Sequence, residues 1–134
     1  MRRLIFTITI AALGLLSSAI AQAKFDGSVP LLCVPIEITE CESASKCYHG
    51  NAEDVNLPQF IKIDFKEKVL SGVDNPPRTT PIDHLKHEHG RVVLHGGQAG
   101  RGWTVVISES TGKLTASISD DGMGFVIFGA CTPL

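Results

Sequence analysis

The last third of the chain is built from short alternating segments that glycine-containing turns separate at nearly even intervals. Trp103, Val105 and Ile107 fall on one side of such a segment, and the residues between them fall on the other. A period of two residues is typical of β-strands with one buried face. This pattern restricts the domain to a β-rich fold and predicts an antiparallel meander over residues 90–134.

Two details refine this meander. Gly112 lies where a hairpin turn needs the left-handed backbone conformation, and Leu114, Ala116 and Ile118 then point inward. The last strand, Phe125–Phe128, is apolar on both faces. That composition is typical of a central or barrel-closing strand rather than a solvated edge.

The patterns that predict secondary structure are weaker in the residues before this meander. Phe60–Lys66 alternates as a half-buried strand does, and Arg78–Ile82, which follows two adjacent prolines, is expected to be a short edge strand. His84–His89 is compatible with a single helical turn. Residues 24–56 are loop-like in composition, with one short strand expected within Leu31–Ile38.

Together these segments predict an all-β domain. An open sheet of short strands would leave its edges and one apolar face exposed, so we expect the antiparallel meander to close into a small barrel. A two-layer sandwich is the alternative. The apolar fraction of 43% is sufficient for one folded domain over residues 24–134, with residues 24–56 loop-rich and stapled by disulfides and residues 57–134 forming the antiparallel strands.

The amino terminus resembles a secretion signal. Arg2 and Arg3 precede the apolar run Leu4–Leu16, and Ala21-Gln22-Ala23 supplies the small residues of a cleavage site. Residues 1–23 are therefore predicted to be a signal peptide, and the mature protein to be periplasmic or secreted. The rival interpretation, an uncleaved membrane anchor, is disfavoured because the apolar run is short for a bilayer, so no stable membrane insertion is expected after cleavage.

Export changes the chemistry expected of the four cysteines, Cys33, Cys41, Cys47 and Cys131. In an oxidising compartment two disulfides are expected, and three connectivities are available. We favour Cys41–Cys47, which closes a compact loop, together with Cys33–Cys131, which joins the two ends of the domain. A zinc site is the rival, but the spacings match no common ligand pattern.

Charge argues against two classes of partner. Removal of residues 1–23 takes Arg2 and Arg3 away and changes the formal charge from −2 to −4. Nucleic acids and anionic lipids are bound by surfaces with a surplus of lysine and arginine. Neither is predicted to be a partner.

Several segments carry a family resemblance. They are Asn56-Leu57-Pro58-x-Phe60-x-x-Ile63-Asp64-Phe65, Gly100-Arg101-Gly102-Trp103, Thr111-Gly112-Lys113-Leu114-Thr115-Ala116 and Gly124-Phe125-Val126-Ile127-Phe128-Gly129-Ala130-Cys131. Together they resemble a family of small, exported, uncharacterised bacterial proteins, from about Cys33 to Cys131. The resemblance implies export and a compact domain. It implies no activity and no catalytic residues.

Histidines are the first candidate site. His84, His87, His89 and His95 fall close together, and imidazole is a good ligand for zinc or copper. If residues 87–95 were extended, three of these histidines would share one strand face with Arg91. The alternative is an ordinary solvated loop, which Gly90 favours by inviting a turn and Arg91 favours by its positive charge.

Arg101 and Trp103 are the second candidate site. Alternate positions on a strand place both on one face, where a guanidinium beside an indole could form a binding surface. Burial of Trp103 in the core is the alternative.

Three functions compete. The first is a non-catalytic binding module of the cell envelope that meets a protein or glycan through its loops or through a face carrying Arg101 and His95. The second is a periplasmic metal-binding protein that uses the histidines. The third is a small hydrolase with a cavity in the barrel mouth, for which Ser108 and Ser110 lie beside Glu109 without a recognised motif. No catalytic residue is assigned, and no cofactor is expected apart from that metal ion.

Overall fold

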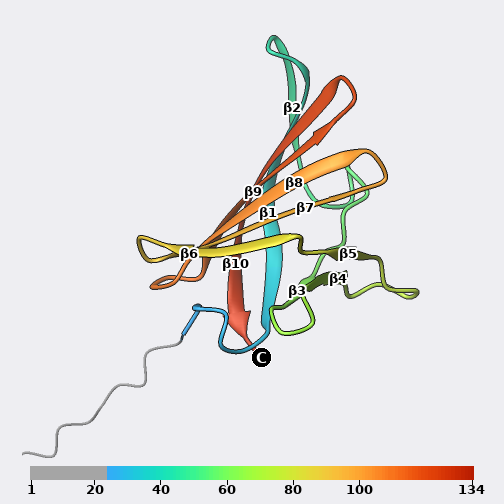
Figure 1. Cartoon of the computed structure of the whole chain (residues 1–134). Helices are drawn as coiled ribbons and strands as arrows, with labels where there is room; N and C mark the ends of the chain where they lie inside the picture. The colour runs from blue at the N-terminus through green and yellow to red at the C-terminus, as the bar shows by residue number, and fades with distance from the viewer. Residues whose placement is uncertain (1–23) are drawn as a thin grey trace, which may run out of the picture.

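A computed structural model describes residues 24–134, and the predicted signal peptide lies outside the described residues. Ten strands form a single antiparallel sheet in the described part of the chain, which contains no helix (Figure 1). The strands are β1 (Leu31–Ser43), β2 (Lys46–Gly50), β3 (Ile61–Asp64), β4 (Val69–Gly72), β5 (Thr79–Pro81), β6 (His84–Glu88), β7 (Arg91–Gln98), β8 (Arg101–Ser108), β9 (Lys113–Asp120) and β10 (Met123–Pro133).

The sheet is strongly curled into a half-barrel (Figure 1). Its strand order is β5-β4-β3-β1-β10-β9-β8-β7-β6, and β2 pairs with β1 off this path. The end strands β5 and β6 are consecutive in sequence, so the chain crosses directly from one end of the sheet to the other. Hydrogen bonds from the amide of Ile82 to the carbonyl of Lys68 and from the amide of Asp83 to the carbonyl of His95 hold this crossing. The all-β, disulfide-tied fold predicted from the sequence is confirmed.

The core fills the concave side of the sheet. Leu31, Ile63, Leu94 and Ile107 are fully buried, and they come from four different strands. In the described residues no polar or charged side chain is buried. The predicted inward positions of β8 and β9 are confirmed, because alternate residues of these two strands point into the core.

The structure corrects the expectation for residues 24–56. Strand β1 continues to Ser43, well past the expected limit at Ile38, and forms a hairpin with β2. A bulge shifts the register between Pro35 and Glu37, which explains how a proline is accommodated inside a long strand. The expected helical turn over His84–His89 is also wrong, because residues 84–88 pair with β7 as strand β6.

Two disulfides, Cys33–Cys131 and Cys41–Cys47, tie the fold, and no cysteine of the described chain is free. This is the favoured connectivity. Cys33 and Cys131 are direct partners in the register of β1 and β10, so the first bond joins the two ends of the domain within the sheet. The disulfides indicate an oxidising environment outside the cytoplasm. No helix long and apolar enough for a membrane crossing occurs in residues 24–134.

Candidate functional site

A cavity of about 340 Å³ opens between the two ends of the curled sheet. One wall comes from β3, β4, β5 and the segments that flank them, and the other from β7 to β10. Most of the lining is apolar. The residues that line it are Leu57, Pro58, Ile61, Leu70, Gly72, Arg78, Thr79, Thr80, Gln98, Ala99, Arg101, Trp103, Ala116, Ile118 and Ile127.

Trp103 joins the two walls. Its indole Nε1–H donates a hydrogen bond of 3.1 Å to the hydroxyl of Thr80 on β5. Gly96 is its cross-strand neighbour on β7, and a Cβ atom there would lie 2.2 Å from the indole ring and 2.5 Å from the carbonyl oxygen of Pro81. The missing side chain of Gly96 therefore makes room for the indole where β5 passes β7.

Arg101 lies at the mouth of the cavity, opposite Gln98 across the β7–β8 hairpin. Its Nε–H donates to the Asp120 carboxylate at 2.6 Å. This hydrogen bond, followed by one from the backbone amide of Asp121, lowers the pKa of Asp120 below the ordinary value of an aspartate. The Arg101 side chain remains 64% exposed, so most of its guanidinium faces solvent.

Arg78 lies on the other wall, and its guanidinium makes more contacts with protein groups than that of Arg101 does. Its Nε–H and Nη2 groups contact the carboxylate of Asp74 at 3.0 and 2.9 Å, and Nη1 donates to the backbone carbonyl of Asn56 at 2.6 Å. This arginine fastens two loops beside the cavity. Its charge is balanced by Asp74 within the same loop.

The lining holds few polar side chains. Among the described residues that line the cavity, these are Arg78, Thr79, Thr80, Gln98, Arg101 and Trp103. An apolar cavity with a few polar groups at one side is the usual form of a small-ligand site. The prediction that Arg101 and Trp103 share one face is confirmed, and both line this cavity.

The four candidate histidines, by contrast, do not gather at one site. Residues 87–95 are not extended, because His89 and Gly90 both have positive φ and form a tight hairpin turn. His84 and His95 pair across β6 and β7, and His95 is hydrogen-bonded to the hydroxyl of Thr104 at 3.0 Å. His87, His89 and His95 therefore do not share one face of a single strand. No group of three or more histidine, cysteine or acidic side chains that could hold a metal occurs in residues 24–134.

His87 contacts Glu109, the residue between the two serines that were considered for catalysis. Its Nδ1–H donates to the Glu109 carboxylate at 2.9 Å, with the imidazole 49% exposed. The hydroxyls of Ser108 and Ser110 contact each other at 3.1 Å.

The expectation that Arg101 and His95 share one face is wrong. Arg101 lies on the same face of β8 as Trp103, whereas His95 pairs with Thr104 on the opposite face.

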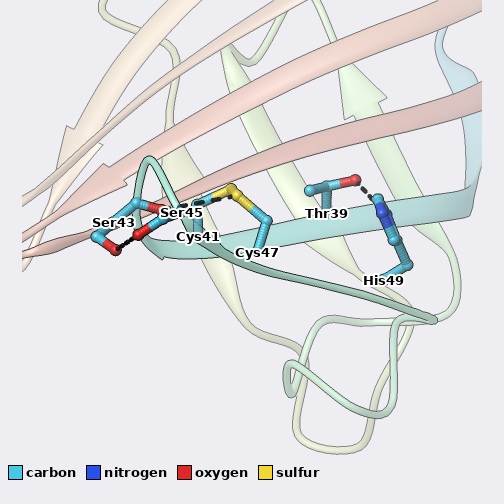
Figure 2. Close-up of a disulfide and its surroundings, with 6 residues drawn as sticks. All are labelled: Thr39, Cys41, Ser43, Ser45, Cys47 and His49. Carbon is cyan, nitrogen blue, oxygen red and sulfur yellow. Dashed lines mark hydrogen bonds between the residues drawn. A yellow bond between two sulfur atoms is a disulfide. The ribbon is translucent and has the colours of Figure 1, made fainter.

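The hairpin of β1 and β2 carries the second disulfide on the outside of the molecule. Figure 2 shows Cys41 bonded to Cys47 across the two strands, with Thr39 and His49 joined by a hydrogen bond of 2.9 Å two residues further along each strand. No residue of β2 is buried. The disulfide therefore takes the place that core contacts would otherwise have in holding this strand.

Some apolar side chains face solvent. Phe60 and Phe128 are each 47% exposed, and Val126 is 40% exposed. Phe128 and Val126 alternate with the buried Ile127 on β10, so they belong to the convex face of the sheet. Val126 and Phe128 form the convex apolar patch, which is distinct from the cavity.

Half of the cavity could not be assigned from the sequence. Leu57, Leu70, Arg78 and Thr80 come from short strands and loops, and they line the same cavity as Trp103 because the chain crosses from β5 to β6 at the other end of the sheet. The adjacent prolines before β5 indicate a turn, but they do not indicate where the following strand lies in the sheet. Comparisons with protein-family models, with curated proteins and with solved structures give no match.

Proposed function

We propose that the protein is an exported, non-catalytic binding module of the bacterial cell envelope, periplasmic or secreted, and that it holds a small ligand in the concave cavity. The observation that supports this most is the composition of the cavity: a largely apolar wall, an indole and an arginine at the mouth, with no carboxylate, thiol or imidazole among the described lining residues. Its volume of about 340 Å³ is at the lower end of the range for small-molecule sites.

A neutral apolar fluorophore, N-phenyl-1-naphthylamine, tests this proposal without assuming the natural ligand. The oxidised mature protein should increase the emission of the fluorophore saturably and with one site per chain. Ala116→Leu should weaken this binding at least about tenfold, because the added carbons would occupy the cavity that Ala116 lines. Failure of the wild-type protein to bind the fluorophore at one saturable site would contradict the proposal.

Thr115→Leu is the matched control. Thr115 is the preceding residue on β9, and it is exposed on the opposite face of the strand. The same substitution there adds the same apolar side chain outside the cavity and should leave fluorophore binding unchanged. If Ala116→Leu lowers stability too far, Gln98→Trp, at an exposed position of the mouth, provides a second obstruction of the same cavity.

A further inference from the structure

The charged groups of the cavity are of one sign. Arg78 and Arg101 are the only ionisable side chains among the described lining residues. Arg78 has each of its three guanidinium nitrogens in contact with Asp74 or Asn56. Arg101 contacts Asp120 through Nε alone, so in the described chain the edge formed by its Nη1 and Nη2 groups has no protein partner.

The remaining lining supplies an apolar surface next to this free edge. Leu70, Ala116 and Ile127 are buried side chains of the cavity, and Trp103 and Ile118 pack against the same core. A ligand that matches both parts needs an apolar tail and a negatively charged head. The limited volume favours a short tail.

We propose that the ligand is a small amphipathic carboxylate, with its tail against the apolar wall and its carboxylate on the Nη1 and Nη2 groups of Arg101. This inference rests on the proposed function and names its ligand class. Guanidinium and carboxylate groups form paired, charge-assisted hydrogen bonds that neutral head groups cannot reproduce. A cationic head group would be repelled by the same arginine.

Asp120 acts here as a positioning residue. It holds the Nε side of the guanidinium from the neighbouring strand β9, and it is not among the residues that line the cavity. Because a guanidinium can engage one carboxylate through Nε and a second through its Nη edge, Asp120 can orient Arg101 without occupying the ligand position. Gln98, directly opposite Arg101, adds an amide donor at the same mouth.

The test compares three probes of equal chain length: octanoate, octan-1-ol and octyltrimethylammonium. Trp103 is the only tryptophan of the protein, so a change in its emission reports binding at the cavity. Octanoate should bind about tenfold more tightly than octanol at low ionic strength, and octyltrimethylammonium more weakly than either. Addition of about 0.5 M NaCl should reduce the advantage of octanoate and leave octanol unchanged, because salt screens an exposed charge pair.

Arg101→Gln should remove the preference for octanoate while octanol binding persists. Arg91→Gln is the matched control, because Arg91 is an exposed arginine at the far end of β7 that does not line the cavity. Equal affinities of wild-type protein for octanoate and octanol, or a preference that survives Arg101→Gln, would overturn the inference while fluorophore binding still supported the cavity. Failure of every probe, the neutral fluorophore included, would overturn the proposed function as well.

Discussion

Gly96 and Gly102 are glycines on facing strands with opposite surroundings. A Cβ atom at Gly96 would clash with Trp103 and with the backbone of Pro81, whereas one at Gly102 would meet nothing within 4 Å. Gly96→Ala is therefore expected to lower the free energy of unfolding by about 1–3 kcal/mol through overpacking. It should also shift the emission of Trp103, and urea denaturation followed by tryptophan fluorescence measures both effects.

Gly102→Ala provides the control for this prediction. Its space is open and its φ is not in the left-handed region, so alanine should leave stability unchanged or raise it slightly. An equal loss of stability in the two variants would show that any side chain in this hairpin is harmful. The proposed contact between Gly96 and the indole would then be wrong.

Asp120 gives a pH-dependent prediction at the same scale. Its pKa lies below the ordinary aspartate value mainly because of the hydrogen bond from Arg101. In Arg101→Gln the pKa of Asp120 should rise toward the ordinary aspartate value, which a carboxyl-carbon NMR titration measures directly. The pKa of Asp120 is lower in the folded protein than in the unfolded chain. Its ionised carboxylate therefore adds to the free energy of unfolding above the unfolded pKa, and this contribution is lost as pH falls through the folded pKa. An unchanged Asp120 pKa in the variant would contradict the pairing.

Residues of the site could be predicted to lie together only where they alternate along one strand. Arg101 and Trp103 lie two positions apart on β8, so their common face follows from the period of a strand. Thr80, which accepts the indole hydrogen bond, is 23 residues away in sequence. No local pattern links these two residues, because their contact depends on how far the whole sheet curls.

At the scale of elements, β2 is the strand that depends most on a covalent bond. It pairs only with β1 and buries none of its residues. Simultaneous Cys41→Ala and Cys47→Ala substitution should therefore abolish amide-exchange protection of β2 while the protection of β8 and β9 persists. Because the loop that this disulfide closes is short, the global free energy of unfolding should fall by only about 2 kcal/mol. Full protection of β2 in the variant would contradict its dependence on the disulfide.

The elements that sequence reasoning missed share a physical cause. In β1, Pro35 and the cysteines gave the segment the composition of a loop, yet the bulge accommodates the proline and both cysteines serve as cross-strand partners. For β6 the segment His84–His89 was compatible with one helical turn. Pairing with β7 around the turn at His89–Gly90 overrode that weak local preference.

At the scale of the whole molecule, the long disulfide is the strongest single tie. Cys33 and Cys131 are 98 residues apart in sequence. In the chain-entropy model a cross-link of this length stabilises the folded state by about 4–5 kcal/mol. The Cys33→Ala and Cys131→Ala double variant should thus lose about twice as much stability as the β1–β2 hairpin variant, as measured by urea denaturation. A smaller loss from the long link would contradict this ranking.

The antiparallel architecture and its barrel-like curl were predictable in outline, but the order of the strands was not. Alternation and glycine turns were enough to predict an antiparallel all-β domain, because these signals are local. The curl of the sheet depends on the crossing from β5 to β6, which places consecutive strands at opposite ends. That crossing creates the cavity, so the site could not be found before the fold was known.

The ligand is predicted to bind inside the half-barrel and not on the convex apolar patch of Val126 and Phe128. The most direct measurement is a ¹H–¹⁵N NMR titration of the oxidised protein with octanoate. The single indole N–H resonance of Trp103 and the amides of β8 and β9 along the cavity should shift together and saturate. Shifts confined to residues around the convex apolar patch, with the indole resonance unmoved, would contradict the account.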